Sequence, residues 1–375
     1  MTSSLPAARG EGPVVRTRFP MREWEKLDAF VARNLRPDTP LRARPMFDWT
    51  FDVEDDSANI LSVWDGDRLT GMLGYHPVTT QWGEAEVTAA WIGHWMVDAA
   101  YRHGAGLRLL AAARALFPLL LGSPWKPESA AIMQRLGATL IPALPRSLVV
   151  FDPQRVRDLL LPGARSARLD TLRHRPAESG GVTPYDPAAY RPDWTRYPAM
   201  AYCARRSPDF IAHRYRQHPA YAYRVYIAGE AGEPALCATR IERALDDETV
   251  LVGRIVDFFH PAGERGRESG LRALAAASRD LASAGCVFAD FTGSPPAFHE
   301  TLAAAGWGLE EPEHPLLPNR IQPVERKPFR HNLIYLRADD ILEPEAGRLY
   351  VTRADWDLDA PQTLSEIESE PLVRR

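Results

Sequence analysis

Two glycines separated by one residue stand in the stretch YRHGAGLRLLAAARAL, between an apolar run and a segment with helical spacing. Backbone N–H groups at the start of a helix have no intrahelical partner and lie at the positive end of the helix dipole. The glycines would let a pyrophosphate approach these amides closely, and the preceding arginine could add a charge-assisted contact. The alternative is a glycine-containing corner that binds nothing. The residues that we assign to the anion are Arg102, His103, Gly104, Ala105, Gly106 and Leu107.

The elements around this turn follow from hydrophobic periodicity. Trp24–Asn34 has helical spacing, and the segment NILSVWDGDRLTGMLGYHPV predicts two strands joined at Asp65-Gly66. The extended run VTAAWIGHWMV leads directly into the glycine turn, and a helix follows the turn. A second helix over Glu128–Leu136 stops at a glycine, and PRSLVVF supplies a further strand. This order of strands and helices predicts an α+β unit.

A similar order returns in the second half of the chain. YAYRVYIAG and PALCATRIER predict a hairpin, followed by the long strand TVLVGRIVDFF, a helix over Leu271–Ala282, the strand GCVFADFTG and a helix over Pro296–Ala305. Corresponding points lie roughly 165 residues apart, which is typical of a duplicated domain. We expect a disordered start at 1–14, a first domain at 15–160, a linker at 161–192, a second domain at 193–345 and a polar, acidic, flexible tail at 353–375.

Composition restricts the classes of protein. A chain of 375 residues with 45% apolar composition and a net charge of −4 is typical of a protein with about two domains and a large core. No stretch is apolar enough to span a bilayer and the start lacks a secretory signal, so we expect a cytoplasmic protein without a membrane partner. The three cysteines are widely spaced and the arginines form no basic stripe, which argues against a disulfide framework, a metal site and nucleic-acid binding. The oligomeric state stays open.

The segments VDAAYRHGAGLRLL and ESAAIMQRLGA, in this order of elements, resemble the Gcn5-related N-acetyltransferase family over residues 15–150. Residues 195–340 resemble it in element order alone, as in tandem members. The resemblance implies two domains, each a mixed, mostly antiparallel, twisted sheet flanked by helices. It implies that acetyl-coenzyme A, without a metal, binds where the fourth strand meets the next helix, its pantetheine arm pairing with the backbone around Met96 and Val97. The family usually places its Arg or Gln three residues before the first glycine, whereas Arg102 stands two before it.

Acetyl transfer needs a base that takes a proton from the attacking amine. Strand alternation from Val97 reaches Trp95 and Trp91, which cannot act as a base. His94 lies on the other parity, but its imidazole titrates near neutral pH and a bulge could turn it toward the cleft. A hydrogen-bonded core histidine is the alternative. Asp98 could orient or replace His94, or could be a solvated turn residue.

The acceptor site is predicted from aromatic and polar residues. Trp91 and Trp95 could floor a pocket for the apolar face of a sugar ring or for a cation, or could be ordinary core residues. The second half has no G-x-G between strand and helix and should bind coenzyme A poorly. Asp257 and His260 could complete the acceptor site if the halves face each other, or could serve as capping and turn residues. Met133 stands where many family members carry a tyrosine acid.

The sequence therefore predicts an acyltransferase that moves an acetyl group from acetyl-coenzyme A to a small-molecule acceptor. The expected acceptor group is an amine, less readily a hydroxyl, of a small polar molecule such as an amino sugar. A Fem-type aminoacyl transferase with charged tRNA as donor is one alternative, against which the absence of a basic patch argues. A non-catalytic ligand-binding or scaffold protein is the other, and the missing tyrosine and glutamate favour it.

Overall fold

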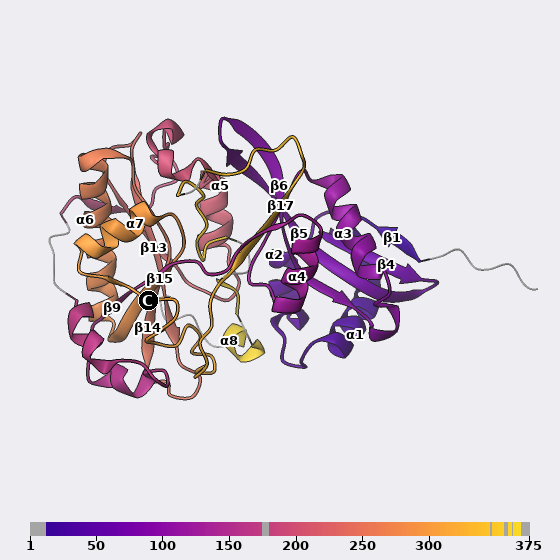
Figure 1. Ribbon diagram of the computed structural model, residues 1–375, viewed down its shortest axis with the longest axis horizontal. Coiled ribbons are helices and arrows are strands. Elements are labelled where there is room, and N and C mark those ends of the chain that lie inside the picture. The colour runs from indigo at the N-terminus through magenta and orange to yellow at the C-terminus, as the bar shows by residue number, and fades with distance from the viewer. Residues whose placement is uncertain (1–12, 175–179, 346, 356–358, 362, 369–375) are drawn as a thin grey trace, which may run out of the picture.

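The computed structural model of the chain describes residues 13–174, 180–345, 347–355, 359–361 and 363–368. Two sheets stand side by side, the first half of the chain forming most of one and the second half most of the other (Figure 1). Helices flank both sheets, so the predicted α+β class with two similar sheets is confirmed. None of the helices in the described ranges combines the length and the apolar character that crossing a bilayer requires.

The first sheet is antiparallel except where β6 and β7 run parallel. The predicted helix at Trp24–Asn34 and the hairpin that turns at Gly66 are confirmed. Helices α1 and α3 lie on β5, and α4 lies on β8 and β17. In order across the sheet the strands are β1 (Val14–Arg16), β4 (Ile60–Asp65), β5 (Arg68–Trp82), β6 (Ala85–Val97), β7 (Leu119–Gly122), β17 (Leu333–Arg337) and β8 (Thr139–Ile141), with β11 (Tyr202–Ala204) also on β5. The helices are α1 (Trp24–Asn34), α2 (Arg44–Thr50), α3 (Ala105–Leu116) and α4 (Pro127–Arg135).

The second sheet repeats this plan. Its parallel pair is β14 with β15, which corresponds to β6 with β7, and the long helix α6 crosses between them. The strands in order are β10 (Val182–Pro184), β12 (Arg224–Ala228), β13 (Ala235–Arg243), β14 (Leu251–Phe259), β15 (Cys286–Thr292), β9 (Arg146–Val150) and β16 (Gly308–Leu309). The helices are α5 (Pro208–Ile211), α6 (Gly263–Ser283) and α7 (Pro296–Ala304). Helix α6 starts eight residues before the predicted helix at Leu271–Ala282. A small sheet of β2 (Phe19–Pro20) and β3 (Ser57–Ala58) and the helix α8 (Leu364–Glu368) complete the described elements.

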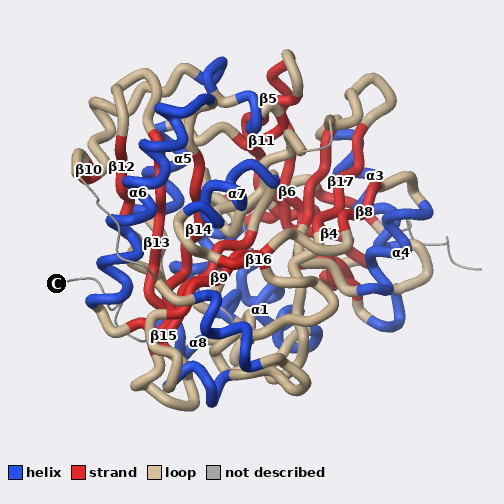
Figure 2. Tube along the Cα trace, turned by 60° about the vertical axis from the view of Figure 1, so that its left-hand side comes forward, coloured by secondary structure: helices blue, strands red, loops and turns tan. Residues whose placement is uncertain are grey.

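The two halves exchange strands. Strand β9 follows β8 directly in the chain, yet it pairs with β15 and β16 of the second sheet. Strand β17 comes after the whole second sheet, yet it inserts between β7 and β8 of the first sheet. Figure 2 shows β17 beside β8. The expected first domain, 15–160, therefore contributes β9 to the second sheet, and the expected second domain, 193–345, contributes β17 and β11 to the first. The linker range 161–192 also differs from expectation, since β10 within it joins the second sheet.

The chain crosses from the first sheet to the second before β9, and from the second sheet back to the first before β17. These two crossing segments are in contact. The Leu144 N–H, which precedes β9, donates to the carbonyl of His331, which precedes β17, at 2.7 Å. The Pro145 carbonyl in turn accepts from the Gly293 N–H at 3.1 Å. A third connection comes from β11, which lies in the second half of the chain and pairs with β5. The halves are therefore joined through backbone hydrogen bonds as well as side-chain contacts.

The prediction of a flexible tail is wrong for residues 353–355 and 359–361, which pack into the second half. Asp355 is 1% exposed and accepts from both terminal nitrogens of Arg206 at 2.8 Å. Asp359 accepts from Nε and Nη2 of Arg240 at 2.6 to 2.9 Å and from the Tyr223 hydroxyl at 2.8 Å. The acidic composition suggested solvation, but these acids neutralise buried arginines. Residues 356–358, 362 and 369–375 of the expected tail, and residues 1–12 of the expected disordered start, lie outside the described part of the chain.

We expect Asp359→Ala to lower the free energy of unfolding by about 3 to 5 kcal/mol, the range for removing one partner of a buried ion pair. Burial alone would raise the pKa of Asp359, but Arg240 holds that pKa well below its ordinary value, so the carboxylate is charged when folded. Its loss leaves the buried Arg240 guanidinium with Glu242 alone, at 3.5 Å, and Glu242 is shared with Arg254. Urea denaturation of the variant measures the effect, with exposed Asp340→Ala as the control. Equal midpoints for the two variants would contradict this role of the tail.

Candidate functional site

A bulge interrupts β6 at the residue that sequence analysis proposed as the base. Met96 pairs with Met72 and Gly93 pairs with Gly74, so two residues of β6 stand opposite one residue of β5. His94 is one of these two and has a φ of +50°, a left-handed conformation that is uncommon for a residue other than glycine. Strained backbone of this kind concentrates at functional sites. The bulge that sequence analysis considered is therefore present at His94.

The bulge reverses the alternation of side chains along β6. Trp91 is 2% exposed and belongs to the core on the α1 face of the sheet, whereas Trp95 and Val97 pack on the opposite face, against α3. Regular alternation would have placed all three on one face. Neither tryptophan is among the residues that line the large cavity described below. The expected floor of the acceptor site is not formed by Trp91 and Trp95.

Strands β6 and β7 separate next to the bulge. They pair only from Ala89 with Leu119 to Trp91 with Leu121. Beyond this point Met96 and Val97 pair with β5 on one side, and no strand of the described chain pairs with them on the other. The backbone of β6 thus has a free edge facing the gap, as expected for a strand that pairs with an extended ligand.

The glycine turn lies at the end of the same strand. Gly104 is the N-cap residue of α3 with a φ of +105°, and its position faces open space. No side chain caps the first turn of α3, where the remaining residues of the predicted site, Ala105, Gly106 and Leu107, begin the helix. Arg102 and His103 are exposed beside it. The structure thus brings all six residues that we assigned to an anion to one uncapped helix start.

Two indoles border the gap between β6 and β7. The Trp95 and Trp125 rings meet edge to face, with their centroids 6.0 Å apart. A side chain at Gly106 would come within 3.2 Å of the Trp95 ring, so the absence of a Cβ there lets the indole approach α3. The Trp95 Nε1 atom is buried and has no hydrogen-bond partner among the described residues. The glycine that was expected to admit an anion also makes room for Trp95.

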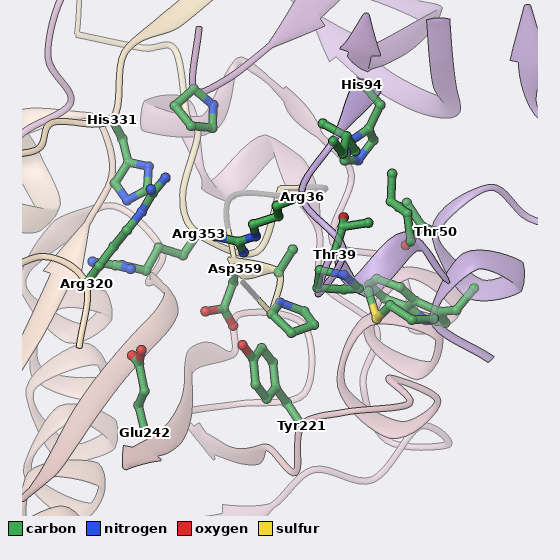
Figure 3. Close-up of a pocket in the computed structure, with 18 of the residues that line it drawn as sticks. Arg36, Thr39, Thr50, His94, Tyr221, Glu242, Arg320, His331, Arg353 and Asp359 are labelled. Atoms are coloured by element: carbon green, nitrogen blue, oxygen red, sulfur yellow. The ribbon is translucent and has the colours of Figure 1, made fainter. Parts of the chain in front are cut away.

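A cavity of about 610 Å³ lies between the two halves and reaches the bulge (Figure 3). His94 lines it from β6, and Pro124 and Lys126 line it from the loop that follows β7. The cavity therefore opens where the two strands separate. Its first-half wall also includes Asn34, Leu35, Arg36, Thr39, Pro40, Leu41, Met46, Trp49 and Thr50, and its second-half wall Tyr221, Arg240, Glu242, Asn319, Arg320, His331, Arg353, Asp359, Ala360 and Pro361.

The His94 imidazole is held in the neutral form. Burial lowers the pKa of His94 to about 4, and the ring meets the Phe51 ring edge to face at 5.6 Å between centroids. A neutral imidazole can accept a proton, although one with a lowered pKa is a weaker base. The position of His94 in the cavity wall is consistent with the predicted role.

The Asp98 carboxylate is hydrogen-bonded to side chains outside the cavity wall and to Asn34. It accepts from Asn34 Nδ2 at 2.8 Å, from Arg68 Nη2 at 2.9 Å and from Arg33 Nη2 at 3.3 Å. Burial alone would raise its pKa, but these donors lower it. Asp98 ties the end of β6 to α1 and β5, and it does not line the cavity.

Neither Met133 nor Tyr101 supplies the acid that a tyrosine of α4 provides in many members of the family. Met133 is 1% exposed and packs in the core under α3. Tyr101 donates its hydroxyl to Asp65 at 2.7 Å, at the tip of the β4–β5 hairpin.

The structure does not bring Asp257 and His260 to His94. Asp257 is fully buried and accepts from Arg206, from Tyr215 and from Tyr350. The His260 ring stands against Gly270 of α6 and bonds Thr301 Oγ1 at 2.9 Å. It lines a separate hollow of about 580 Å³ at the start of α6. The second-half residues that do face His94 come from the segments around 320, 331 and 353, for which the sequence carried no local signal.

The comparable gap of the second sheet is filled. Strands β14 and β15 pair only as far as Ile255 with Phe291. Beyond that point the Phe258, Phe298 and Tyr350 rings meet edge to face, with centroids 5.4 to 6.1 Å apart where Phe298 meets the other two. All three rings are buried. Among the described residues no group of histidine, cysteine or acidic side chains is arranged to hold a metal ion.

Solved structures with this fold share little sequence with the chain, and no family model and no curated protein matches it. A probable N-acyltransferase of unknown function from Enterococcus faecalis V583 aligns over 87% of this chain and 72% of its own, with a TM-score of 0.53 and 10% identity. A GCN5-related N-acetyltransferase from Anabaena variabilis ATCC 29413 aligns over 86% and 72%, with a TM-score of 0.50 and 13% identity. Saccharomyces cerevisiae N-myristoyltransferase with bound myristoyl-CoA aligns over 93% and 85%, with a TM-score of 0.50 and 9% identity. The chain therefore has the fold of the GCN5-related N-acetyltransferases, with two such sheets joined by exchanged strands.

Proposed function

We propose that the protein is an acyl-coenzyme A-dependent acyltransferase that transfers an acetyl group to the amine of a small polar acceptor. The observation that carries this proposal is the coincidence of three features at one end of β6. The strand has a free edge, it leads to an uncapped helix start, and its bulge places His94 in the wall of a cavity large enough for a small molecule. The fold alone would not support an activity.

Each feature has a part in the proposed reaction. The backbone N–H groups of residues 105–107 bind the pyrophosphate, and the backbone of Met96 and Val97 pairs with the pantetheine arm. The amine nitrogen attacks the thioester carbonyl, so a C–N bond forms and the C–S bond breaks. His94 accepts the proton that the nitrogen loses and passes it to solvent. The second half supplies the far wall of the acceptor cavity.

We expect Gly104→Glu to weaken coenzyme A binding by about a hundredfold or more, because a negative side chain replaces the opening for the pyrophosphate and removes charge-assisted contacts. Since any side chain is strained at a φ of +105°, Arg102→Glu provides a second, unstrained charge reversal at an exposed position. Isothermal titration calorimetry with coenzyme A measures both. Arg135→Glu, exposed on α4, is the matched control. Parental affinity in folded Gly104→Glu and Arg102→Glu variants would refute the site.

A non-catalytic scaffold or ligand-binding protein that does not take coenzyme A into the gap is the second candidate, and the two indoles that border the gap favour it. Trp95 and Trp125 occupy space beside the free edge of β6, where the acyl-coenzyme A arm is proposed to run. If these rings do not move, a ligand is excluded from the gap. Calorimetry on Trp95→Ala distinguishes the candidates. Tighter coenzyme A binding in the variant than in the parent would show that the indole blocks the gap, whereas weaker binding would show that it contacts the ligand.

A further inference from the structure

The backbone conformation of His94 is one that a histidine does not favour by itself. The first residue of a bulge with a left-handed φ is ordinarily a glycine, whereas His94 carries an imidazole at a φ of +50°. Such a conformation persists only where the surrounding structure stabilises it. The groups that pack against His94 therefore determine where its imidazole lies.

The Phe51 ring packs against the imidazole. The two rings meet edge to face with their centroids 5.6 Å apart. Phe51 ends α2, is fully buried and belongs to the core on the α1 face of the sheet. Thr50, the residue before it, lines the cavity on the same side as His94 (Figure 3). Phe51 is not among the residues that line the cavity, so its ring stands behind the imidazole as seen from the cavity.

Gly74 lets the Phe51 ring reach this place. It stands in β5 and pairs with Gly93, the residue that precedes His94 in the bulge. A Cβ atom at Gly74 would lie 2.3 Å from Cε1 of Phe51 and 3.2 Å from Cδ1 and Cζ. The ring therefore lies directly against the backbone of β5 at the bulge. A side chain at position 74 would displace the ring from the imidazole.

Backbone hydrogen bonds tie Phe51 to the neighbouring elements. Its N–H donates to the carbonyl of Phe47 at 3.0 Å, and its carbonyl accepts from the N–H of Asn59 at 2.9 Å. The Asn59 carbonyl in turn accepts from the N–H of Tyr75, the residue after Gly74, at 3.0 Å. A backbone movement that withdrew the ring from the bulge would break these bonds.

We propose that Phe51 is a positioning residue for the proposed reaction, whose ring, admitted by Gly74, holds the His94 imidazole in the cavity wall. This inference rests on the proposed function, in which His94 takes the proton of the acceptor amine. Phe51 acts through His94 and not on the ligand. A base that is held in place before the ligand arrives needs no reorientation during the reaction.

The titration of His94 reports its contact with the phenyl ring. Burial lowers the pKa of His94 to about 4, and the ring is part of what buries the imidazole. The charged or titratable side chains on the neighbouring elements include Asp52, whose Oδ2 lies 2.6 Å from Nδ1 of His76, and Arg36 and Lys126 of the cavity wall. These side chains are unchanged in the variants below.

Nuclear magnetic resonance of the full chain with labelled histidine measures this pKa, and the signal that His94→Gln removes belongs to His94. We expect the parental imidazole to titrate near pH 4. Its pKa should rise by about one pH unit or more in Phe51→Leu and in Gly74→Ala, because each change takes the ring away from the imidazole and admits water. Phe19→Leu removes the same atoms from the same core cluster, where the Phe19 ring stacks on Trp64, and should leave the pKa unchanged.

Two outcomes of this titration would overturn the proposal. The first is a parental His94 that titrates near pH 6.5, which needs no variant to be observed. The second is a parental His94 pKa in a folded Phe51→Leu or Gly74→Ala protein. Neither outcome involves an acyl donor or an acceptor, so both are independent of the proposed function.

Kinetics then connect the contact to the reaction. With acetyl-coenzyme A and glucosamine as the substrate probes, we expect Phe51→Leu to lower kcat by about ten- to a hundredfold and to leave KM nearly unchanged, because a misplaced catalytic group costs up to about 10²-fold. In the His94→Gln background the same change should cause no further loss. A raised His94 pKa together with a parental kcat would remove both residues from the reaction, whereas coenzyme A binding would still stand.

Discussion

A chain that ends at residue 160 is expected not to fold, although it contains nearly all of the predicted first domain. It lacks β17, which lies between β7 and β8, so nothing joins β8 to the rest of the first sheet. It retains β9, whose five residues are all buried in the full chain, where β9 pairs with strands of the second sheet. The result would be a sheet with a gap and an exposed apolar strand, which favours aggregation. Far-ultraviolet circular dichroism and thermal melting measure the outcome.

The matched control joins the strands that the exchange separates. Ile141 at the end of β8 pairs with Leu333 at the start of β17, so a short Asn-Gly turn can connect them as a hairpin. We expect a chain of residues 13–141, this turn and residues 333–341 to melt cooperatively. It contains every strand of the continuous first sheet and omits β9. A cooperative melt of residues 1–160 alone would contradict the structural role of the exchange.

His94→Ala is expected to lower turnover by about 10²-fold while leaving coenzyme A affinity nearly unchanged. General-base catalysis contributes about 10²- to 10⁴-fold, and an imidazole with a lowered pKa belongs at the lower end because it is a weaker base. A general base acts in the transition state, so kcat should fall more than the affinity for either ligand if His94 has the proposed role. Steady-state kinetics together with calorimetry separate the two effects.

His94→Gln distinguishes catalysis from structure. Glutamine keeps much of the size and the hydrogen-bonding capacity of histidine but cannot take a proton at neutral pH. A structural histidine would tolerate glutamine better than alanine, whereas a base would tolerate neither. His314→Gln, an exposed histidine outside the cavity, is the control. Parental turnover in His94→Gln would assign His94 to structure.

The pH dependence of kcat is a second test of the role of His94. The sequence led us to expect an acidic limb near pH 6 to 7, but burial lowers the pKa of His94 to about 4. The base form is the neutral imidazole, which persists above that value. We therefore expect kcat to be insensitive to His94 ionisation between about pH 5 and 8 and to fall only toward pH 4. An acidic limb near 6.5 that disappears in His94→Gln would instead show that the imidazole titrates as an exposed one.

The parts of the fold that follow from local pattern could be predicted from the sequence. Three such parts are the helix at Trp24–Asn34, the Asp65-Gly66 hairpin and the glycine turn before α3. Each depends on residues that are close together in the sequence. The order of these elements also indicated the second copy. His94 was identified because few other groups near the turn can accept a proton.

The parts that the sequence did not predict depend on contacts between distant segments. PRSLVVF has the composition of a buried strand, but nothing in its residues selects the second sheet over the first. The acidic residues of the tail are solvated in most proteins, and Asp359 is buried because Arg240 lies more than a hundred residues earlier in the chain. Trp91 and Trp95 lie on opposite faces of the sheet because the residue inserted by the bulge at His94 changes the alternation of side chains along β6.

The crossing segments also decide how a ligand can enter the cavity. His331 lines the cavity and, through its carbonyl, holds the partner crossing at Leu144. A hinge rotation that opened the halves would have to strain both crossing segments and the pairing of β11 with β5. The width of the cavity is therefore set by the scaffold, and admission depends on the loops at its rim, such as the one that carries Arg36. A protein with the proposed function would therefore discriminate first by the size of the molecule that passes the rim.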